Sequence, residues 1–255
     1  MSFNIRTLLN ILLLAGGALS NVSHAYAGEC QVAVAANFAE PIKAIAVVFE
    51  KTTGHKLLVT LGATGKLYAQ IKNGAPFDML LSADSKTPEL LEKEGLAQPG
   101  SRFTYATGKL VLWSADAKGV DAKGDVLKNG QFRKFAYATP KLAPYGAAAE
   151  QVIDKLGLTS ALTSKLVQGE SIGQTFNFVQ TGNAELGFVA LSQVLEGGKL
   201  KNGSMWLIPQ QLYTPIQQDA VVLKRAANND AAQALVKLLK SPNIKDLIRS
   251  YGYDI

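Results

Sequence analysis

Four short segments combine small or hydrogen-bonding residues with the predicted start of a helix. Each follows a short apolar stretch, and together they comprise Ala36 and Asn37; Ala63, Thr64 and Gly65; Pro144, Tyr145 and Gly146; and Ser171, Ile172 and Gly173. A helix start leaves its first N–H groups unpaired and carries partial positive charge, so it favours a negatively charged ligand. Four such turns in a chain with few catalytic groups indicate a binding protein for one small anion rather than an enzyme.

The side chains in these turns also permit purely structural interpretations. Asn37 and Glu40 have the spacing of a capping box, whereas a binding role would have the Asn37 amide and the N–H groups around it donate to an oxyanion. Tyr145 either donates its hydroxyl into a cleft or packs in the core with that hydroxyl satisfied. Ile172 offers only a main-chain N–H, which suits anion binding and not catalysis.

The segment 62–66 (GATGK) is similar to the end of a nucleotide-binding P-loop but departs from it at two positions. Thr60 stands where the motif has its first glycine, and Leu67 stands where it has Ser or Thr. Nucleotide binding is therefore not expected. The Thr64 hydroxyl at a helix start still suits a small anion, and Lys66 either approaches that anion or lies in solvent.

The sequence lacks the residue patterns of common catalytic and metal sites. It contains no H-E-x-x-H, C-x-x-C or G-x-G-x-x-G motif. Cys30 is the only cysteine, which excludes an intramolecular disulfide, and we expect it to be a small buried residue. Because His55 is the only histidine after residue 27, a conventional zinc site is excluded as well. We expect no cofactor and no metal beyond the ligand itself.

Residues 1–27 have the features of a cleaved signal peptide. Arg6 precedes the apolar stretch 8–19, and residues 25–27 (AYA) form an A-x-A cleavage motif. The alternatives are a buried N-terminal helix, a membrane anchor or a lipoprotein anchor, although Glu29 before Cys30 argues against lipidation. We therefore predict export to the periplasm. No later segment is long and apolar enough to span a bilayer.

The charge of the chain is mildly positive. The formal net charge is +6 at pH 7, and removing the leader with its single arginine leaves +5. Such a charge helps to attract an anion, but without a run of Lys or Arg it is weak support for nucleic-acid binding. No nucleic-acid partner is expected.

Short apolar strands alternate with helical patterns along the chain, which predicts the α/β class with mostly parallel sheets flanked by helices. The length suits two lobes of about 110 residues. We assign 28–106 plus 217–255 to lobe 1 and 107–216 to lobe 2. Strands are expected at 32–35, 57–61, 77–82, 110–113, 135–138, 165–167, 186–190, 206–208 and 221–223, and helices at 42–49, 67–72, 87–93, 147–156, 173–179, 231–240 and 244–251.

The turns lie within longer stretches that resemble the periplasmic molybdate-binding proteins of bacterial ABC importers. The resemblance covers nearly all of the chain after the leader, and the N-G-A-P-x-D and S-A-D segments are quite specific to that family. The matching stretches are 33–38 (AVAANF), 62–65 (GATG), 68–78 (YAQIKNGAPFD), 81–84 (LSAD), 100–105 (GSRFTY), 108–114 (GKLVLWS), 143–146 (APYG), 171–174 (SIGQ) and 186–190 (LGFVA).

This resemblance implies a two-lobed, type II periplasmic-binding fold that closes on molybdate or tungstate in its cleft. It implies neutral donors, a membrane permease as partner, a monomer and no enzymatic activity. The best-studied branch has Ser at the position of Asn37 and Tyr at the position of Ala190; Tyr145 is the substitute for that missing hydroxyl. Carried over to this chain, the ligand-binding residues are Ala36, Asn37, Thr64, Tyr145 and the main chain of Ile172.

Two other functions remain open at this point. One is a receptor for another tetrahedral oxyanion such as sulfate, which differs from molybdate mainly in size. The other is an exported enzyme on the same fold, for example a dehydratase acting on a carboxylate. The enzyme would need a charged acid or base in the cleft, whereas a receptor of the predicted kind needs only neutral donors.

Overall fold

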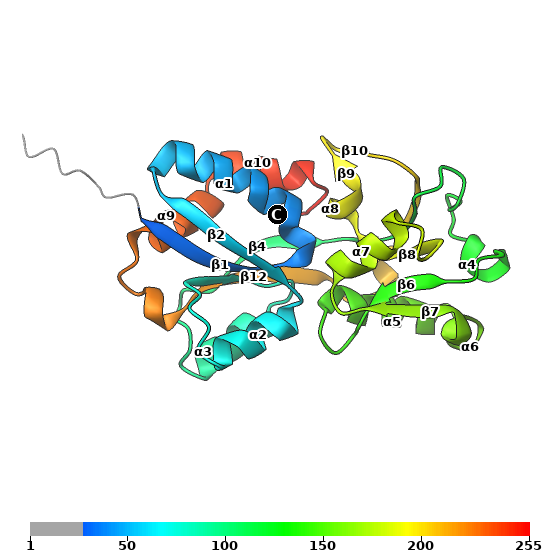
Figure 1. Ribbon diagram of the computed structural model, residues 1–255, viewed down its shortest axis with the longest axis horizontal. Coiled ribbons are helices and arrows are strands. Elements are labelled where there is room, and N and C mark those ends of the chain that lie inside the picture. Colours follow the sequence, from blue (N-terminus) through cyan, green and yellow to red (C-terminus); the bar gives the residue numbers. More distant parts are fainter. Residues whose placement is uncertain (1–27) are drawn as a thin grey trace, which may run out of the picture.

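Two five-stranded sheets organise the chain, one in each of two lobes that lie side by side (Figure 1). The computed structural model describes residues 28–255, and the predicted signal peptide at 1–27 lies outside them. We call the half built on the first sheet lobe 1 and the half built on the second sheet lobe 2. Among the described residues no helix is both long and apolar enough to cross a membrane.

The sheet of lobe 1 has the strand order β2-β1-β3-β12-β4. Its strands are β1 (Glu29–Ala35), β2 (Lys56–Gly62), β3 (Met79–Leu81), β4 (Phe103–Gly108) and β12 (Ile216–Val222). The helical segments of this lobe are η1 (Ala36–Phe38), α1 (Ala39–Thr53), α2 (Thr64–Lys72), α3 (Lys86–Lys93), η4 (Lys224–Ala226), α9 (Asp230–Leu239) and α10 (Pro242–Ser250).

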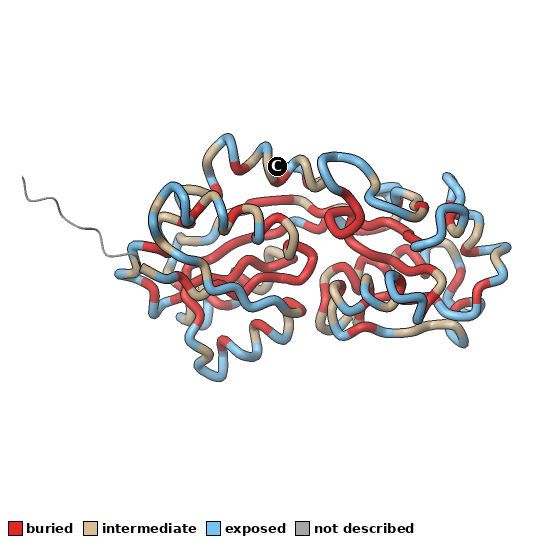
Figure 2. Tube along the Cα trace, turned by 45° about the horizontal axis from the view of Figure 1, so that its top comes forward, coloured by how far each residue is buried: buried red, intermediate tan, exposed pale blue. Residues whose placement is uncertain are grey.

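Alternating apolar side chains explain why this sheet is covered on both faces. Val32 and Val34 of β1 pack with α1, α9 and α10, whereas Ala33 between them packs with α2 and α3. Successive residues of a strand point to opposite faces, so each stretch of apolar residues supplies two cores. Figure 2 shows the resulting buried strands running through the interior of the lobes.

The sheet of lobe 2 has the strand order β11-β5-β8-β6-β7. Its strands are β5 (Leu110–Ser114), β6 (Phe135–Ala138), β7 (Leu166–Gly169), β8 (Leu186–Ala190) and β11 (Ser204–Leu207), beside a small hairpin of β9 (Leu195–Glu196) and β10 (Lys199–Leu200). The helical segments are α4 (Val126–Asn129), α5 (Pro144–Lys155), α6 (Thr159–Leu162), η2 (Thr163–Lys165), α7 (Ile172–Gln180), α8 (Leu191–Val194) and η3 (Gln210–Leu212). α5 covers one face and α7 with α8 the other.

The predicted α/β class with two lobes is confirmed, but both sheets are mixed rather than mostly parallel. β12 runs antiparallel to β3 and β4, and β5 runs antiparallel to β8 and β11. The reason is the route of the chain, which crosses into lobe 2 from β4 to β5 and returns through β12 (Figure 1). Strand β4 was not predicted, because its residues were interpreted as part of the crossing.

Cys30 is fully buried on β1, as expected, and this burial determines its reactivity. Burial, assisted by the nearby Asp78 carboxylate, raises the pKa of the thiol to about 12.

We expect a thiol-specific reagent to leave Cys30 of the native protein unmodified at neutral pH, because the thiolate is the reactive form. Mass spectrometry should show one adduct per chain in denaturant and none without it; rapid labelling of the native protein would contradict this placement.

Candidate functional site

The four predicted turns meet at one small cavity between the lobes. Its volume is about 10 Å³, about the room that one water molecule needs. All five residues predicted to bind a ligand line this cavity, and none is more than 9% exposed. The full lining consists of Ala35, Ala36, Asn37, Gly62, Ala63, Thr64, Ala83, Ala143, Pro144, Tyr145 and Ile172.

The topology of the two sheets explains why these residues meet. β1 and β2 are parallel neighbours in lobe 1, and η1 and α2 start directly beyond their carboxyl ends. β6 and β7 are parallel neighbours in lobe 2, and α5 and α7 start beyond theirs. The carboxyl ends of parallel strands are the usual ligand edge of an open α/β sheet. Here the two edges face each other, so helix starts from both lobes surround one space.

The cavity is electrically neutral. Every residue that lines it is uncharged. Carboxylates do occur in the two larger clefts that share lining residues with it, and each has a partner: Glu40 binds Lys43 at 2.8 Å, and Asp84 accepts from the Thr87 N–H at 2.8 Å. The charged acid or base that an enzyme would need is therefore absent from the lining of the cavity.

The lobes touch on both sides of the cavity. The first of the two larger clefts has a volume of about 780 Å³ and is lined by Lys66 of lobe 1 and Glu170 of lobe 2, which form an ion pair across it. Beside the second cleft, of about 690 Å³, the Gly65 N–H donates to the Leu142 carbonyl at 3.0 Å. A Cβ atom on Gly65 would lie 3.3 Å from the Leu142 backbone, so the absent side chain permits this approach. The lobes are closed around the cavity.

Two hydroxyl groups in the lining are arranged as donors. The Thr64 hydroxyl oxygen accepts from the Ala83 N–H at 3.1 Å, and the Tyr145 hydroxyl oxygen accepts from the Gln218 side chain at 3.1 Å. Each oxygen is thereby satisfied as an acceptor while its hydrogen remains free to donate. Burial raises the pKa of Tyr145 well above its ordinary value, so this group keeps its proton.

The Asn37 side chain differs from the prediction. Its Nδ2 donates to Gln218 Oε1 and to the Tyr253 hydroxyl, both at 2.9 Å, and its buried Oδ1 has no hydrogen-bond partner among residues 28–255. It also forms no capping box, because α1 begins after Phe38 without a side-chain cap and Glu40 pairs with Lys43. The donor that Asn37 offers is its backbone N–H at the start of η1.

Ile172 is the first residue of α7, where the main-chain N–H has no earlier turn to bond to. Its carbonyl accepts from Gln193 Nε2 at 3.1 Å, and Gln193 Oε1 accepts from the Ala190 N–H at 2.9 Å. Ala190 itself is buried and does not line the cavity. A side-chain contact at that position is therefore absent, as the sequence indicated.

A layer of buried polar residues behind the cavity was missed by the sequence analysis. Tyr105, Gln193, Gln218 and Tyr253 contact the lining residues or one another, and Ser192 donates to the Asn37 carbonyl at 2.8 Å. One available signal was the polar stretch 217–219 inside strand β12, between Ile216 and the apolar residues 220–222, since such polar residues are rarely buried without a specific partner. The tyrosines gave no signal of this kind.

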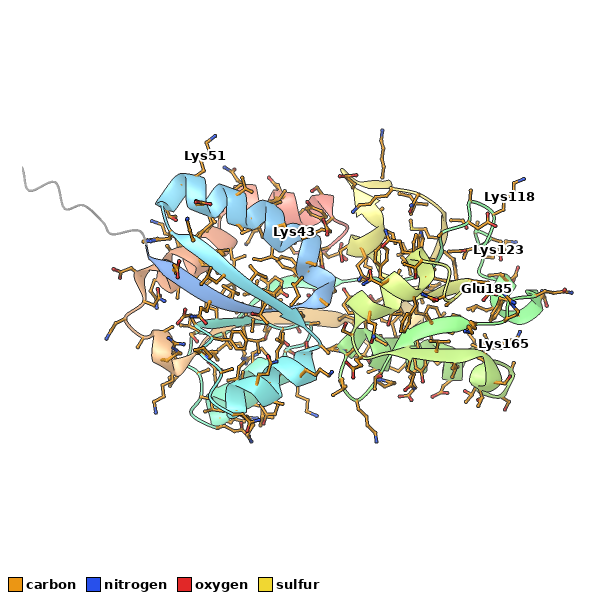
Figure 3. All side chains as sticks on the ribbon, viewed as in Figure 1. Lys43, Lys51, Lys118, Lys123, Lys165 and Glu185 are labelled. Carbon is orange, nitrogen blue, oxygen red and sulfur yellow. The ribbon has the colours of Figure 1, made fainter. Side chains whose placement is uncertain are left out.

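Charged side chains occur on the surfaces of both lobes. Lys51 points outward from lobe 1, and Lys118 and Lys123 point outward from lobe 2 (Figure 3). Within residues 28–255 no group of His, Cys, Asp and Glu side chains is arranged to hold a metal ion.

Comparison with known proteins yields one consistent group of relatives. The family described as bacterial extracellular solute-binding protein matches residues 30–254. The chain is 57% identical to the molybdate-binding protein ModA of Azotobacter vinelandii over the full length of both, and 53% identical to that of Rhodobacter capsulatus over 90% of this chain and 89% of the relative. Its fold matches the solved periplasmic molybdate-binding protein of Azotobacter vinelandii with a TM-score of 0.86, at 42% identity, covering 89% and 99% of the two chains.

The buried tyrosines predict a loss of stability in alkali. Burial raises the pKa of Tyr105, Tyr145 and Tyr253 in the folded state, whereas an exposed tyrosine in the unfolded chain ionises near pH 10. Above about pH 10 the unfolded state therefore binds fewer protons, and the free energy of unfolding falls by about 1.4 kcal/mol per pH unit for each buried tyrosine. Urea denaturation between about pH 9 and about pH 11 measures this slope, which Tyr145→Phe should reduce by one such contribution.

Proposed function

Because the chain belongs to the bacterial extracellular solute-binding protein family, we propose that it captures molybdate or tungstate and delivers the ion to an ABC importer. The single observation that carries this proposal is the convergence of five buried residues from four turns on one uncharged cavity. Two relatives that are more than 50% identical over the aligned residues are both named molybdate-binding proteins.

In this proposal the ion is held by hydrogen bonds alone. The main-chain N–H groups of Ala36, Asn37 and Ile172 lie at helical starts, where partial positive charge favours an anion. The hydroxyls of Thr64 and Tyr145 donate their free hydrogens. Both lobes contribute donors, so the ligand shell is complete only when the lobes are closed.

The chemistry of this lining selects among anions. Molybdate, tungstate and sulfate are tetrahedral dianions that carry no proton at neutral pH, so every oxygen can accept from a donor. Protonated phosphate would direct its O–H at a donor and leave both groups unsatisfied. Size then distinguishes sulfate from molybdate, because donors that both lobes hold at the spacing of the larger ion lie too far from the oxygens of the smaller one.

The setting of this activity follows from the same proposal. Residues 1–27 act as a cleaved signal peptide that sends the mature chain to the periplasm. The protein acts there as a monomer, with residues 28–106 and 217–255 in one lobe and 107–216 in the other. The closed form with its ion is the form that a membrane permease receives. Lobe opening at the permease releases the ion, since opening separates the two sets of donors.

We expect molybdate and tungstate to bind, sulfate to bind at least about tenfold more weakly, and phosphate to give no measurable binding. Titration of the purified mature protein, followed by tryptophan fluorescence and by calorimetry, measures all four ions under the same conditions. Equal affinity for sulfate and molybdate would instead support a general receptor for tetrahedral oxyanions.

The two donor hydroxyls can be tested by single substitutions. Thr64→Ala and Tyr145→Phe should each weaken molybdate binding by about 1–3 kcal/mol, since each leaves part of a buried dianion without a donor. Two matched controls lie on α2. Lys66→Ala removes only an exposed ion pair with Glu170 and should change affinity less than about fivefold. Tyr68→Phe removes a hydroxyl that binds Glu94 outside the cavity and should have no effect. The assigned site would be contradicted if calorimetry showed that either control variant loses as much molybdate affinity as the two cavity variants.

A further inference from the structure

Gln218 lies on β12, the strand by which the chain returns to lobe 1, and its side chain is completely buried. Its amide bonds to side chains from three other segments. Oε1 accepts from Asn37 Nδ2 at 2.9 Å and lies 3.0 Å from the Tyr105 hydroxyl, while Nε2 donates to the Tyr145 hydroxyl at 3.1 Å. One amide thus connects a turn of lobe 1 with the first turn of α5 in lobe 2.

The structure gives the two ends of the Gln218 amide different roles. The oxygen faces Asn37 Nδ2, which donates to it at 2.9 Å. The nitrogen of the same amide then faces Tyr145, and it also can only donate. The Tyr145 oxygen must therefore accept this bond, and its single hydrogen is directed elsewhere. Two places are open to that hydrogen: the nearby Tyr253 hydroxyl and, once an anion is bound, the cavity that Tyr145 lines.

We propose that Gln218 is a positioning residue for oxyanion binding: it holds the Tyr145 hydroxyl so that the hydrogen is presented to the ligand. This inference rests on the proposed function. A residue that accepted from Tyr145 instead would take the hydrogen and turn an oxygen lone pair toward a dianion. Because Asn37 and Tyr145 belong to different lobes, this arrangement also forms only when the lobes are closed.

Two features of the backbone make room for this arrangement. The pairing of β4 with β12 skips Tyr105, since Gln218 lies opposite Ala106 and Asp219 opposite Thr104. Gly108, at the end of β4, has no side chain where Gln218 and Tyr145 meet. A Cβ atom there would lie 2.0 Å from the Tyr145 hydroxyl oxygen and 2.5 Å from Gln218 Nε2. The glycine is therefore required by the side-chain pair.

A double-mutant cycle on molybdate affinity separates this role from simple packing. We expect Gln218→Met to weaken binding about tenfold in the unsubstituted protein and less than about twofold in the Tyr145→Phe background, where the hydroxyl is already absent. In the Thr64→Ala background the loss should remain about tenfold, since Thr64 and Gln218 share no hydrogen bond. Equal losses in all backgrounds would overturn the inference while leaving the proposed function intact.

Gln218→Glu gives the same test in a side chain of nearly unchanged shape, should Gln218→Met fail to fold. Its carboxylate accepts the Tyr145 hydrogen, so Tyr145→Phe should cost less than about twofold in this background. A full loss on Tyr145→Phe in this background contradicts the inference. Absence of oxyanion binding by the unsubstituted protein contradicts the proposed function, and the inference with it.

Discussion

A dianion in a closed cavity without counter-charges is stable only if nearly every group that faces it donates a hydrogen bond. Removing such an ion from water is costly, and the cost rises steeply when even one oxygen is left without a donor. The lining of the cavity in this protein carries no formal charge, so a dianion bound there would depend on such donors alone. The two-lobed construction follows from this requirement, because donors that surround an ion on all sides must come from more than one element and must separate to let it leave.

The same requirement extends to the residues behind the cavity. A hydroxyl is both donor and acceptor, so it donates reliably to an anion only when another group occupies its oxygen. Ala83 does this for Thr64 through a main-chain N–H, and Gln218 does it for Tyr145 through a side chain. Ile172 needs no such help, since a peptide N–H can only donate, and Gln193 instead holds the Ile172 carbonyl. The buried polar layer thus occupies the acceptor side of each hydroxyl, so that the hydroxyl is left to donate.

The sequence predicted the fold class and the meeting of the turns because both depend on local patterns. Apolar spacing predicted α1, and helix starts after strands marked the positions that line the cavity. The mixed sheets and β4 were missed because strand direction depends on the route of the chain between lobes. The sequence analysis offered two roles for the Asn37 side chain, a helix cap and an oxyanion donor, but its partners Gln218 and Tyr253 lie 181 and 216 residues away in sequence. No local pattern reports contacts at such separations.

These long-range contacts also explain why binding and closure are linked. The Lys66–Glu170 pair and the Gly65–Leu142 hydrogen bond join the lobes from either side of the cavity, but both lie in or beside clefts that open to solvent. An exposed ion pair contributes at most about 1 kcal/mol, so contacts of this kind hold the closed form only weakly by themselves. The larger gain is available from an ion that receives donors from both lobes at once. A ligand that binds only the closed form shifts the equilibrium toward it by its full differential affinity.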